Sequence, residues 1–394
     1  MGEKVRVGLV YGGRSGEHEV SLQTALAVMK AFDYTQYEIK PFYISKEGEW
    51  RAGDTLLAPP SGLEQLRLAG DDAIIGTDAL MPVFGAQAED PAAASISSLP
   101  AEVTISALSS AQPVEGVDDA QIDVVFPLLH GTFGEDGTIQ GLLEMANIPY
   151  VGAGVLASAV GMDKITMKKV FAQEGLPQCL FRYFNRTQWL KDSDYYIMEI
   201  EVALGYPCFI KPANLGSSVG ISKARNRDEL IAAVDYALHF DRKVIVEEFI
   251  DAREIEVSVL GNDEPRASVV GEITSSSEFY DYKAKYIDGK SMMHIPANIS
   301  AEVSESVREM ALRAFQAIDG SGLSRVDFFL RKEDGQLFIN EVNTMPGFTP
   351  YSMYPLMWKE SGVSYAELLD TLIALAIERH ADKQLIDYSG GNPA

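Results

Sequence analysis

A hairpin pattern near the C-terminus sets the architecture of the chain. It reads Ser324-Arg325-Val326-Asp327-Phe328-Phe329-Leu330, then Glu333-Asp334-Gly335, then Phe338-Ile339-Asn340-Glu341-Val342-Asn343-Thr344. Two runs rich in β-branched and aromatic residues flank an Asp-Gly turn, which predicts two antiparallel strands. If residues 333–335 form a three-residue loop with Gly335 in the left-handed conformation, Asp327 lies opposite Glu341 and Arg325 lies opposite Asn343.

This register gathers three oxygen-bearing side chains and one cation on a single face of the hairpin. Carboxylate and amide oxygens suit a hard cation such as Mg²⁺, which keeps several waters and shares its coordination sphere with phosphate. The alternative is an edge hairpin with a solvated polar face. The apolar residues of the opposite face, and the break at Met345-Pro346-Gly347, favour a metal site formed by Asp327, Glu341 and Asn343.

Length and charge narrow the classes of function. A chain of 394 residues exceeds one compact core, so two or three domains are expected. The net charge of −24 argues against nucleic-acid and anionic-membrane partners, because both bind basic surfaces. The two cysteines, Cys179 and Cys208, form no CxxC pattern and are expected to be reduced thiols. No apolar run approaches the ~20 residues of a transmembrane helix, so we expect a cytoplasmic protein.

The order of the predicted elements indicates an α/β protein. A strand at 5–11, a glycine loop at 12–16 and a helix at 17–31 open a doubly wound domain. A strand at 148–152 is expected to end it. We expect an N-terminal domain at 1–152, a central lobe at 153–247 and a C-terminal lobe at 248–394. The first domain is expected to contain an Ala/Ser/Pro-rich insertion at about 53–120, with a short strand near 103–105.

Two glycine-rich loops at the ends of strands are candidate binding segments. Residues 214–220 follow a strand that ends in Lys211, and glycines there let backbone N–H groups approach phosphate oxygens. The spacing is not that of a Walker A loop, and a flexible turn without a ligand is the alternative. His130 lies in the second loop, where a structural and a functional interpretation both stay open.

Acidic and aromatic segments supply further candidates. On position alone, Glu17 is an acid that stabilises a helix N-terminus. On the same basis, the strand end at Glu247 and Glu248, with Glu254 and Glu256 soon after, favours a solvated acidic turn. The alternative is that these acids hydrogen-bond an adenine edge and a ribose. Residues 279–286 are rich in Tyr and Lys and lack periodicity, which is typical of a lid over an active site.

Taken together, these motifs resemble those of the D-alanine–D-alanine ligases of bacterial wall synthesis, within the ATP-grasp superfamily. The resemblance spans nearly the whole chain apart from the insertion. Its motifs are His130-Gly131 with Gly134-Glu135-Asp136-Gly137; Met162-Asp163-Lys164; Ile210-Lys211-Pro212 with Gly216-Ser217-Ser218-Val219-Gly220; Tyr280 to Tyr286; Arg325-Val326-Asp327; and Asn340 to Thr349. It implies a pre-ATP-grasp N-terminal domain and a two-lobed α+β ATP-grasp fold.

The resemblance also implies roles for individual residues. For ATP binding these are Lys164, Lys211, Ser217, Ser218, Glu247, Glu248, Ile250 and Glu254. For two Mg²⁺ ions, or Mn²⁺, they are Asp327, Glu341 and Asn343. For the first D-alanine, the implied residues are Glu17, which receives the ammonium, and His130 and Lys285, which lie near the carboxylate. For the second amino acid, the implied residues are Ser352 and Met353. Ser217, Tyr286 and Glu17 would brace the lid, and Arg325 with the Gly347 N–H would bind the oxyanion.

The resemblance further implies a homodimer formed through the first domain. D-Alanine–D-lactate and D-alanine–D-serine ligases remain alternatives, because selecting one small group is worth only ~1–3 kcal/mol. Tyr286 favours the dipeptide over the lactate product. A nucleotide-binding regulatory protein without catalysis is a further alternative, which the intact charged set argues against. A dinucleotide-binding dehydrogenase is disfavoured because Gly12, Gly13 and Gly16 do not have the GxGxxG spacing.

Overall fold

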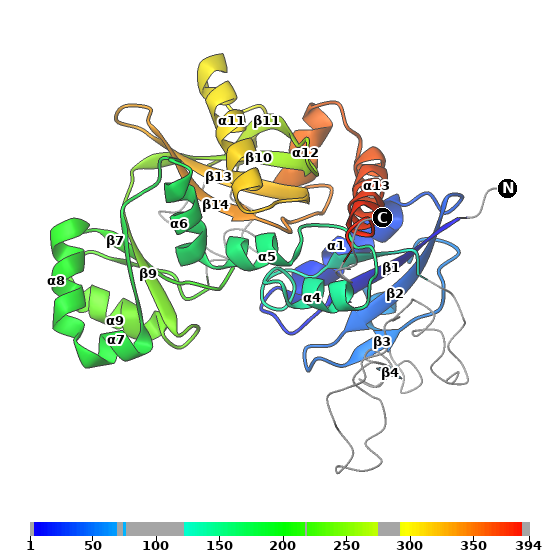
Figure 1. Cartoon of the computed structure of the whole chain (residues 1–394), viewed down its shortest axis with the longest axis horizontal. Coiled ribbons are helices and arrows are strands. Elements are labelled where there is room, and N and C mark those ends of the chain that lie inside the picture. The colour runs from blue at the N-terminus through cyan, green and yellow to red at the C-terminus, as the bar shows by residue number, and fades with distance from the viewer. Residues whose placement is uncertain (1–3, 69–73, 76–121, 217–218, 275–291, 388–394) are drawn as a thin grey trace, which may run out of the picture.

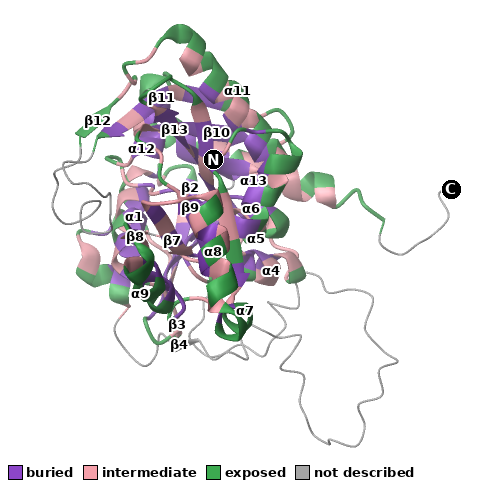
Figure 2. Cartoon of the chain, turned by 90° about the vertical axis from the view of Figure 1, so that its left-hand side faces the viewer, coloured by how far each residue is buried: buried purple, intermediate pink, exposed green. Residues whose placement is uncertain are grey.

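The computed structural model describes residues 4–68, 74–75, 122–216, 219–274 and 292–387. Within these residues the chain forms three β-sheets, each covered by helices (Figure 1). Most strand residues are buried, and the outer faces of the helices are exposed (Figure 2). The predicted α/β architecture is therefore confirmed at the level of its sheets and helices.

The first sheet has the strand order β4-β3-β2-β1-β5. Its strands are β1 (Val5–Gly12), β2 (Tyr37–Ile44), β3 (Trp50–Ala52), β4 (Ile74–Ile75) and β5 (Val124–Leu128). β1 pairs with β2 and β5 in parallel, as a doubly wound sheet requires. Helix α1 (His18–Ala31) covers one face and α4 (Thr138–Met145) the other.

Two predictions for this region need comment. The strand expected at 148–152 is wrong, because only an isolated parallel bridge joins Tyr150 to Val125. Pro149 removes one backbone donor there, which limits pairing. In the insertion, β4 and a 3₁₀ helix (η1, Leu63–Arg67) are present, and the short strand expected near 103–105 lies outside the described residues.

The second sheet is antiparallel, with the order β6-β9-β7-β8. Its strands are β6 (Phe181–Asn185), β7 (Cys208–Pro212), β8 (Ser222–Ala224) and β9 (Lys243–Glu248). Helices α7 (Arg186–Lys191), α8 (Ser193–Ala203) and α9 (Arg227–Ala237) pack on this sheet, as does part of α6 (Lys164–Gln173). Helix α5 (Val155–Met162) precedes α6 and packs in the core of the third sheet. Phe184, Cys208 and Val244 face the core shared with α7, α8 and α9, while Ile245 packs on the other face with Ile165 of α6.

The third sheet is also antiparallel, with the order β12-β11-β10-β13-β14. Its strands are β10 (Ala252–Gly261), β11 (Arg266–Thr274), β12 (Met292–His294), β13 (Gly322–Arg331) and β14 (Leu337–Asn343). Helix α11 (Ala301–Ala317) packs on the face that carries Val257 and Phe328. Helix α12 (Met353–Glu360) packs on the opposite face, where the Ser258 hydroxyl donates to the Tyr354 carbonyl.

The β13–β14 hairpin has the predicted site pairing but a different turn. Asp327 lies opposite Glu341 and Arg325 opposite Asn343, and Gly335 has a φ of 73°. The predicted three-residue loop is wrong, because Arg331 already pairs with Gln336. The register shifts by one residue between Asp327 and Phe328, so Asn340 is an unpaired bulge residue. Without the bulge, the register set by the turn would place Asn340 opposite Asp327 and Glu341 opposite Val326, on the core face.

The last helix, α13 (Tyr365–Lys383), joins the C-terminal lobe to the first sheet. Leu369, Leu372 and Ile373 belong to the same apolar core as Val7 and Ile39. A capping box at Ser364 and Glu367 fixes its start. Among the described residues, no helix is long and apolar enough to cross a membrane.

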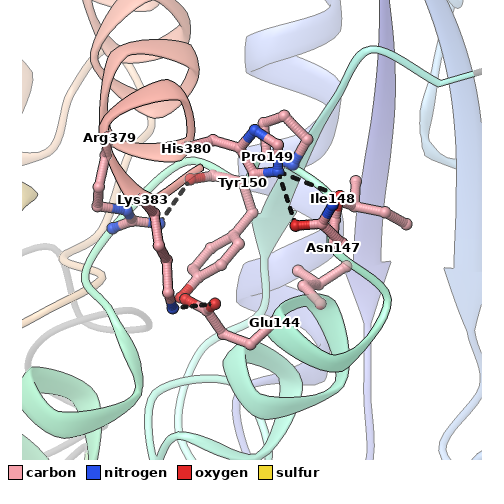
Figure 3. Close-up of a pocket in the computed structure, with 9 residues that line it drawn as sticks. Glu144, Asn147, Ile148, Pro149, Tyr150, Arg379, His380 and Lys383 are labelled. Carbon is pink, nitrogen blue, oxygen red and sulfur yellow. Dashed lines mark hydrogen bonds and ion pairs between the residues drawn. The ribbon is translucent and has the colours of Figure 1, made fainter. Parts of the chain in front are cut away.

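Polar contacts anchor the end of α13 to the first domain (Figure 3). Arg379 donates to the carbonyl of Tyr150 (3.0 Å) and to the carbonyl of Gly152, and its guanidinium lies 4.3 Å from the centroid of the Tyr150 ring. Lys383 and the Tyr150 hydroxyl both bind the carboxylate of Glu144. The C-terminal helix therefore holds the segment at which the N-terminal sheet ends.

Candidate active site

A group of charged side chains lies on the polar face of the β13–β14 hairpin. The Arg325 guanidinium donates from Nε and Nη2 to the two oxygens of Asp327, each at 2.7 Å, and its Nε lies 3.0 Å from Glu256 Oε2. The Asn343 amide donates to Asp327 Oδ2 at 2.9 Å. Strand alternation and the pairing of β10 with β13 bring these residues to one face. We call Glu256, Arg325, Asp327, Glu341 and Asn343 the hairpin cluster.

Acids outnumber the cation in the hairpin cluster. Burial opposes the charge on Arg325, but Asp327 and Glu256 outweigh it and hold the pKa of the guanidinium well above its ordinary range. Among the described residues, no three His, Cys, Asp or Glu side chains converge as a metal site by themselves. Two carboxylates and one amide oxygen are nevertheless the donor set of a Mg²⁺ ion that takes its remaining ligands from phosphate and water. The cluster therefore fits the metal that the sequence predicts.

A second group of charges lies between β7, β9 and α6. Glu247 accepts from Lys211 at 2.6 Å and lies 3.2 Å from Lys168 Nζ. The Glu247 and Lys168 side chains are only 3% and 1% exposed. Burial alone would raise the pKa of Glu247, but Lys168 and Lys211 lower it to about 2. We call Lys168, Lys211 and Glu247 the lysine cluster.

Lys168 is a member of the lysine cluster that sequence reasoning missed. It lies one turn after Lys164 on α6 and shares the buried face of that helix with Phe171. A lysine on an otherwise apolar stripe is the signal that could have indicated a buried partner. Its Nζ also lies 3.4 Å from Cys179 Sγ, so this thiol is buried beside a charge.

Lys164 lies between the glycine-rich loop and the hairpin cluster. Its ammonium donates to the Leu215 carbonyl at 3.0 Å and lies 3.5 Å from Glu341 Oε2. The glycine-rich loop after β7 therefore approaches the hairpin cluster through this lysine. The remaining candidates for nucleotide binding lie where β9 passes into β10. Glu248 accepts a hydrogen bond from the Leu180 N–H at 2.7 Å. Ile250 lies in the short connection between the two strands, and Glu254 lies in β10.

Glu17 lies where the first domain meets the central lobe. A Cβ added to Gly131 would lie 2.7 Å from Glu17 Oε2, and one added to Gly216 would lie 3.4 Å from the same atom. The Ser15 hydroxyl accepts from the Glu17 N–H and donates to the His130 carbonyl. Three segments that are distant in sequence therefore meet at this carboxylate.

His130 is fully engaged by protein groups. Its Nδ1 lies 3.1 Å from the Met345 carbonyl oxygen, and its Nε2 lies 3.2 Å from Thr24 Oγ1. Burial lowers the pKa of the imidazole, which favours the neutral ring. A carbonyl only accepts hydrogen bonds, so we assign the ring proton to Nδ1.

The segment after β14 carries the remaining described candidates. The Ser352 hydroxyl lies 2.8 Å from Thr349 Oγ1, and a Cβ on Gly347 would approach it to 3.2 Å. The Met353 side chain is buried against Gly271 of β11. Four predicted site residues, Ser217, Ser218, Lys285 and Tyr286, lie outside the described residues, as does the predicted lid.

Two family models match the chain. One, described as D-ala D-ala ligase N-terminus, covers residues 6–153, and the other, described as D-ala D-ala ligase C-terminus, covers residues 170–374. A D-alanine–D-alanine ligase of Bacillus cytotoxicus is 52% identical over 386 residues, which span 98% of this chain and 99% of the relative. The chain belongs to the D-alanine–D-alanine ligase family.

Solved structures agree with this family assignment. The D-alanine–D-alanine ligase from Coxiella burnetii has a TM-score of 0.75 and 32% identity, covering 98% of this chain and 97% of that one. The VanG D-Ala:D-Ser ligase from Enterococcus faecalis has a TM-score of 0.76 and 35% identity, covering 95% and 100%. The fold is thus that of the D-alanine–D-alanine ligases: an N-terminal α/β domain followed by an ATP-grasp fold, as the sequence predicts.

Proposed function

We propose that the chain joins two D-alanine molecules to D-alanyl-D-alanine, with ATP cleaved to ADP and phosphate, for peptidoglycan precursor synthesis. The observation that carries the proposal is the 52% identity to a D-alanine–D-alanine ligase over nearly the full length of both chains. The hairpin and lysine clusters add the charges that such a reaction needs. We further propose the domain division 1–152, 153–247 and 248–394.

In this proposal the nucleotide lies between the central and C-terminal lobes. Lys164 and Lys211 bind its phosphates. Glu247, Glu248, the backbone at Ile250, and Glu254 contact the adenine and ribose, and Ser217 and Ser218 of the glycine-rich loop approach the phosphates. The lysine cluster supports this assignment, because two lysines face one glutamate and leave an excess positive charge for an anion.

Asp327, Glu341 and Asn343 are the proposed ligands of two Mg²⁺ ions, with Mn²⁺ as a possible substitute. When bound, such ions neutralise phosphate charge and polarise the transferred phosphoryl group. The residues of the chain then align the reactants. Glu17 receives the ammonium of the first D-alanine, and His130 and Lys285 lie near its carboxylate.

The chemistry follows from the fact that a carboxylate and an amine do not condense unaided in water. The first D-alanine carboxylate attacks the γ-phosphorus and forms an acyl phosphate, with ADP leaving. The amine of the second D-alanine, held near Ser352 and Met353, attacks the acyl carbon, and phosphate leaves. Arg325 and the Gly347 N–H stabilise the oxyanion; losing one such donor typically costs ~3–4 kcal/mol.

The acyl phosphate hydrolyses readily, so the site must exclude water while it exists. We assign this role to the Tyr-rich segment 279–286, with Tyr286, Ser217 and Glu17 bracing it. Replacing Tyr286 with Ala is expected to raise ATP hydrolysis that yields no dipeptide. Unchanged coupling between ATP use and dipeptide formation would contradict the lid role.

The decisive experiment measures phosphate release from ATP and Mg²⁺ with D-alanine alone, with D-alanine plus D-lactate, and with D-alanine plus D-serine, and resolves the products by mass. D-alanyl-D-alanine as the dominant product is the expected result. A dominant D-Ala-D-Ser or D-Ala-D-lactate product would overturn the second-substrate assignment. No D-alanine-dependent release would overturn the ligase proposal.

We also propose a homodimer formed through the first domain, and action in the cytoplasm, where ATP is supplied.

A further inference from the structure

The main chain of Met345 is held on both sides by side chains from a different domain. Its N–H donates to Glu135 Oε1 at 3.1 Å, and its carbonyl accepts from His130 Nδ1 at 3.1 Å. Met345 follows β14, whereas His130 and Glu135 follow β5, more than 200 residues earlier. Gly347, the proposed oxyanion donor, is two residues further along the held segment.

The second oxygen of Glu135 points back into its own loop. Oε2 accepts from the Gly131 N–H at 2.7 Å. Gly131 has a φ of 77° and lies against the Glu17 carboxylate, so a side chain there is excluded both by conformation and by space. One carboxylate therefore ties the backbone beneath Glu17 to the backbone that leads to Gly347.

A glutamate side chain is unfavourable at position 135 unless both of its oxygens accept hydrogen bonds. Burial, followed by repulsion from Glu17, raises the pKa of Glu135 to about 8, and the hydrogen bonds from Gly131 and Met345 and the charge of Arg325 only partly oppose this. Glutamine has the same shape but one acceptor oxygen, so its NH₂ would face one of the two N–H groups. Each of the two oxygens faces one backbone N–H, which explains why Glu and not Gln is present here.

We propose that Glu135 is a positioning residue that sets the distance between the ammonium site at Glu17 and the oxyanion donor at Gly347. The inference rests on the proposed ligase function. The first chemical step, phosphoryl transfer, uses the hairpin and lysine clusters and does not use the Met345 backbone. The second step, attack of the amine, depends on the Gly347 N–H. Loss of Glu135 should therefore slow the second step selectively and leave the acyl phosphate to hydrolyse.

The test is the ratio of phosphate released to dipeptide formed in the full-length Glu135→Gln variant, with Mg²⁺, ATP and saturating D-alanine. The coupled wild-type reaction gives one phosphate per dipeptide. In Glu135→Gln we expect dipeptide formation to fall about 10- to 100-fold, as for a small misplacement of a reacting group, while phosphate release falls less. The ratio then rises severalfold.

The matched control is Glu144→Gln. The Glu144 carboxylate also accepts from two donors, Tyr150 and Lys383, but lies on α4 away from the site, so its ratio should stay at that of the wild type. The ratio does not depend on the folded fraction, because unfolded molecules contribute to neither product. Glu135→Asp, whose shorter carboxylate cannot span both N–H groups, should raise the ratio as well.

Two results would overturn the inference while the ligase proposal stands. One is a wild-type ratio in both Glu135 variants, whatever their rates. The other is loss of all phosphate release in the two variants, because the first step should survive. If the wild-type protein itself shows no D-alanine-dependent phosphate release, the ligase proposal fails first, and this inference fails with it.

Discussion

The hairpin cluster and the lysine cluster both combine acidic and basic side chains, but in opposite proportions. In the hairpin cluster three carboxylates surround one guanidinium, whereas in the lysine cluster two ammonium groups surround one carboxylate. The first leaves an excess of negative charge and the second an excess of positive charge. Lys164 lies on α6 one turn before Lys168 of the lysine cluster, and its Nζ lies 3.5 Å from Glu341 of the hairpin cluster. A metal-bound polyphosphate presents both signs of charge, so the pair of clusters matches it.

The two clusters also differ in burial. Asp327 and Arg325 keep 14% and 16% of their side-chain surface exposed, whereas Glu247 and Lys168 keep 3% and 1%. Charges that are nearly buried depend on their partners for stability, and partly exposed charges can exchange partners with an incoming ligand. We therefore expect changes in the hairpin cluster to affect turnover and changes in the lysine cluster to affect both ATP binding and folding.

The largest effect should come from Asp327→Asn. Replacing the carboxylate with an amide removes one of the two acidic oxygen donors for a metal and weakens the hold on Arg325. Turnover should fall by about two to three orders of magnitude, and the Mg²⁺ concentration for half-maximal rate should rise. The control is Asp334→Asn in the turn of the same hairpin, where Asp334 pairs with Arg331. Equal losses in both variants would contradict a metal-binding role for Asp327.

The next largest effect should come from Lys168→Met. In this variant Lys211 is the only cation beside Glu247, so its positive charge would be neutralised by that carboxylate and not by the phosphates of ATP. The KM for ATP should therefore rise about tenfold, while the KM for D-alanine stays the same. Breaking a buried ion pair should also lower the free energy of unfolding by about 3 kcal/mol. The control is Lys169→Met, the next residue, which is exposed on α6. A loss of stability with an unchanged KM for ATP would assign Lys168 to folding alone.

A smaller, pH-dependent effect on stability should come from Glu247→Gln. The pKa of Glu247 is lowered to about 2 in the folded protein, below its ordinary value of 4.5. Its contribution to stability is therefore fully present above pH 4.5 and is lost as the pH falls towards 2. Urea unfolding of Glu247→Gln should differ most from wild type near neutral pH and converge with it in acid. A difference from wild type that stays the same between pH 7 and pH 2 would contradict this assignment.

The smallest effect should come from deleting Asn340. The deletion removes the bulge and keeps Glu341 and Asn343 on the face that carries Asp327, because the pairing on both sides of the bulge is preserved. Deleting Val342 instead moves Asn343 to the core face. Turnover should therefore fall less in the Asn340 deletion than in the Val342 deletion, whose loss should approach that of Asp327→Asn. Equal loss in the two deletions would show that the register does not decide the site.

The hairpin cluster was largely predictable from sequence and the lysine cluster was not. Alternation and the Asp-Gly turn are local signals, and they predict the pairing of Asp327 with Glu341. The bulge was missed because the need for it comes from the core opposite Phe328. Lys168 becomes a site residue only when β9 brings Glu247 beside it, 79 positions later in the sequence. Charge pairing across such a separation leaves no local pattern.

The same distinction holds for the fold. The strand expected at 5–11 and the helix expected at 17–31 have clear apolar patterns, and β1 and α1 match them to within one residue at each end. The segments at β6, α7, α8 and α12 were not predicted, because they are short and their apolar residues follow no single period. The strand expected at 148–152 had the right composition but only one bridging partner.

The packing of α13 on the first sheet has a consequence for biosynthesis. Ile373 of α13 belongs to the same core as Val7 of β1 and Ile39 of β2. It is synthesised roughly 330 residues after β2, which at ~5–20 residues per second takes on the order of 15 to 65 s. Until α13 has been synthesised, part of one apolar face of the N-terminal sheet stays uncovered in the ribosome-bound chain. The nascent chain therefore needs protection from aggregation for most of its translation, and its first domain is completed by some of its last residues.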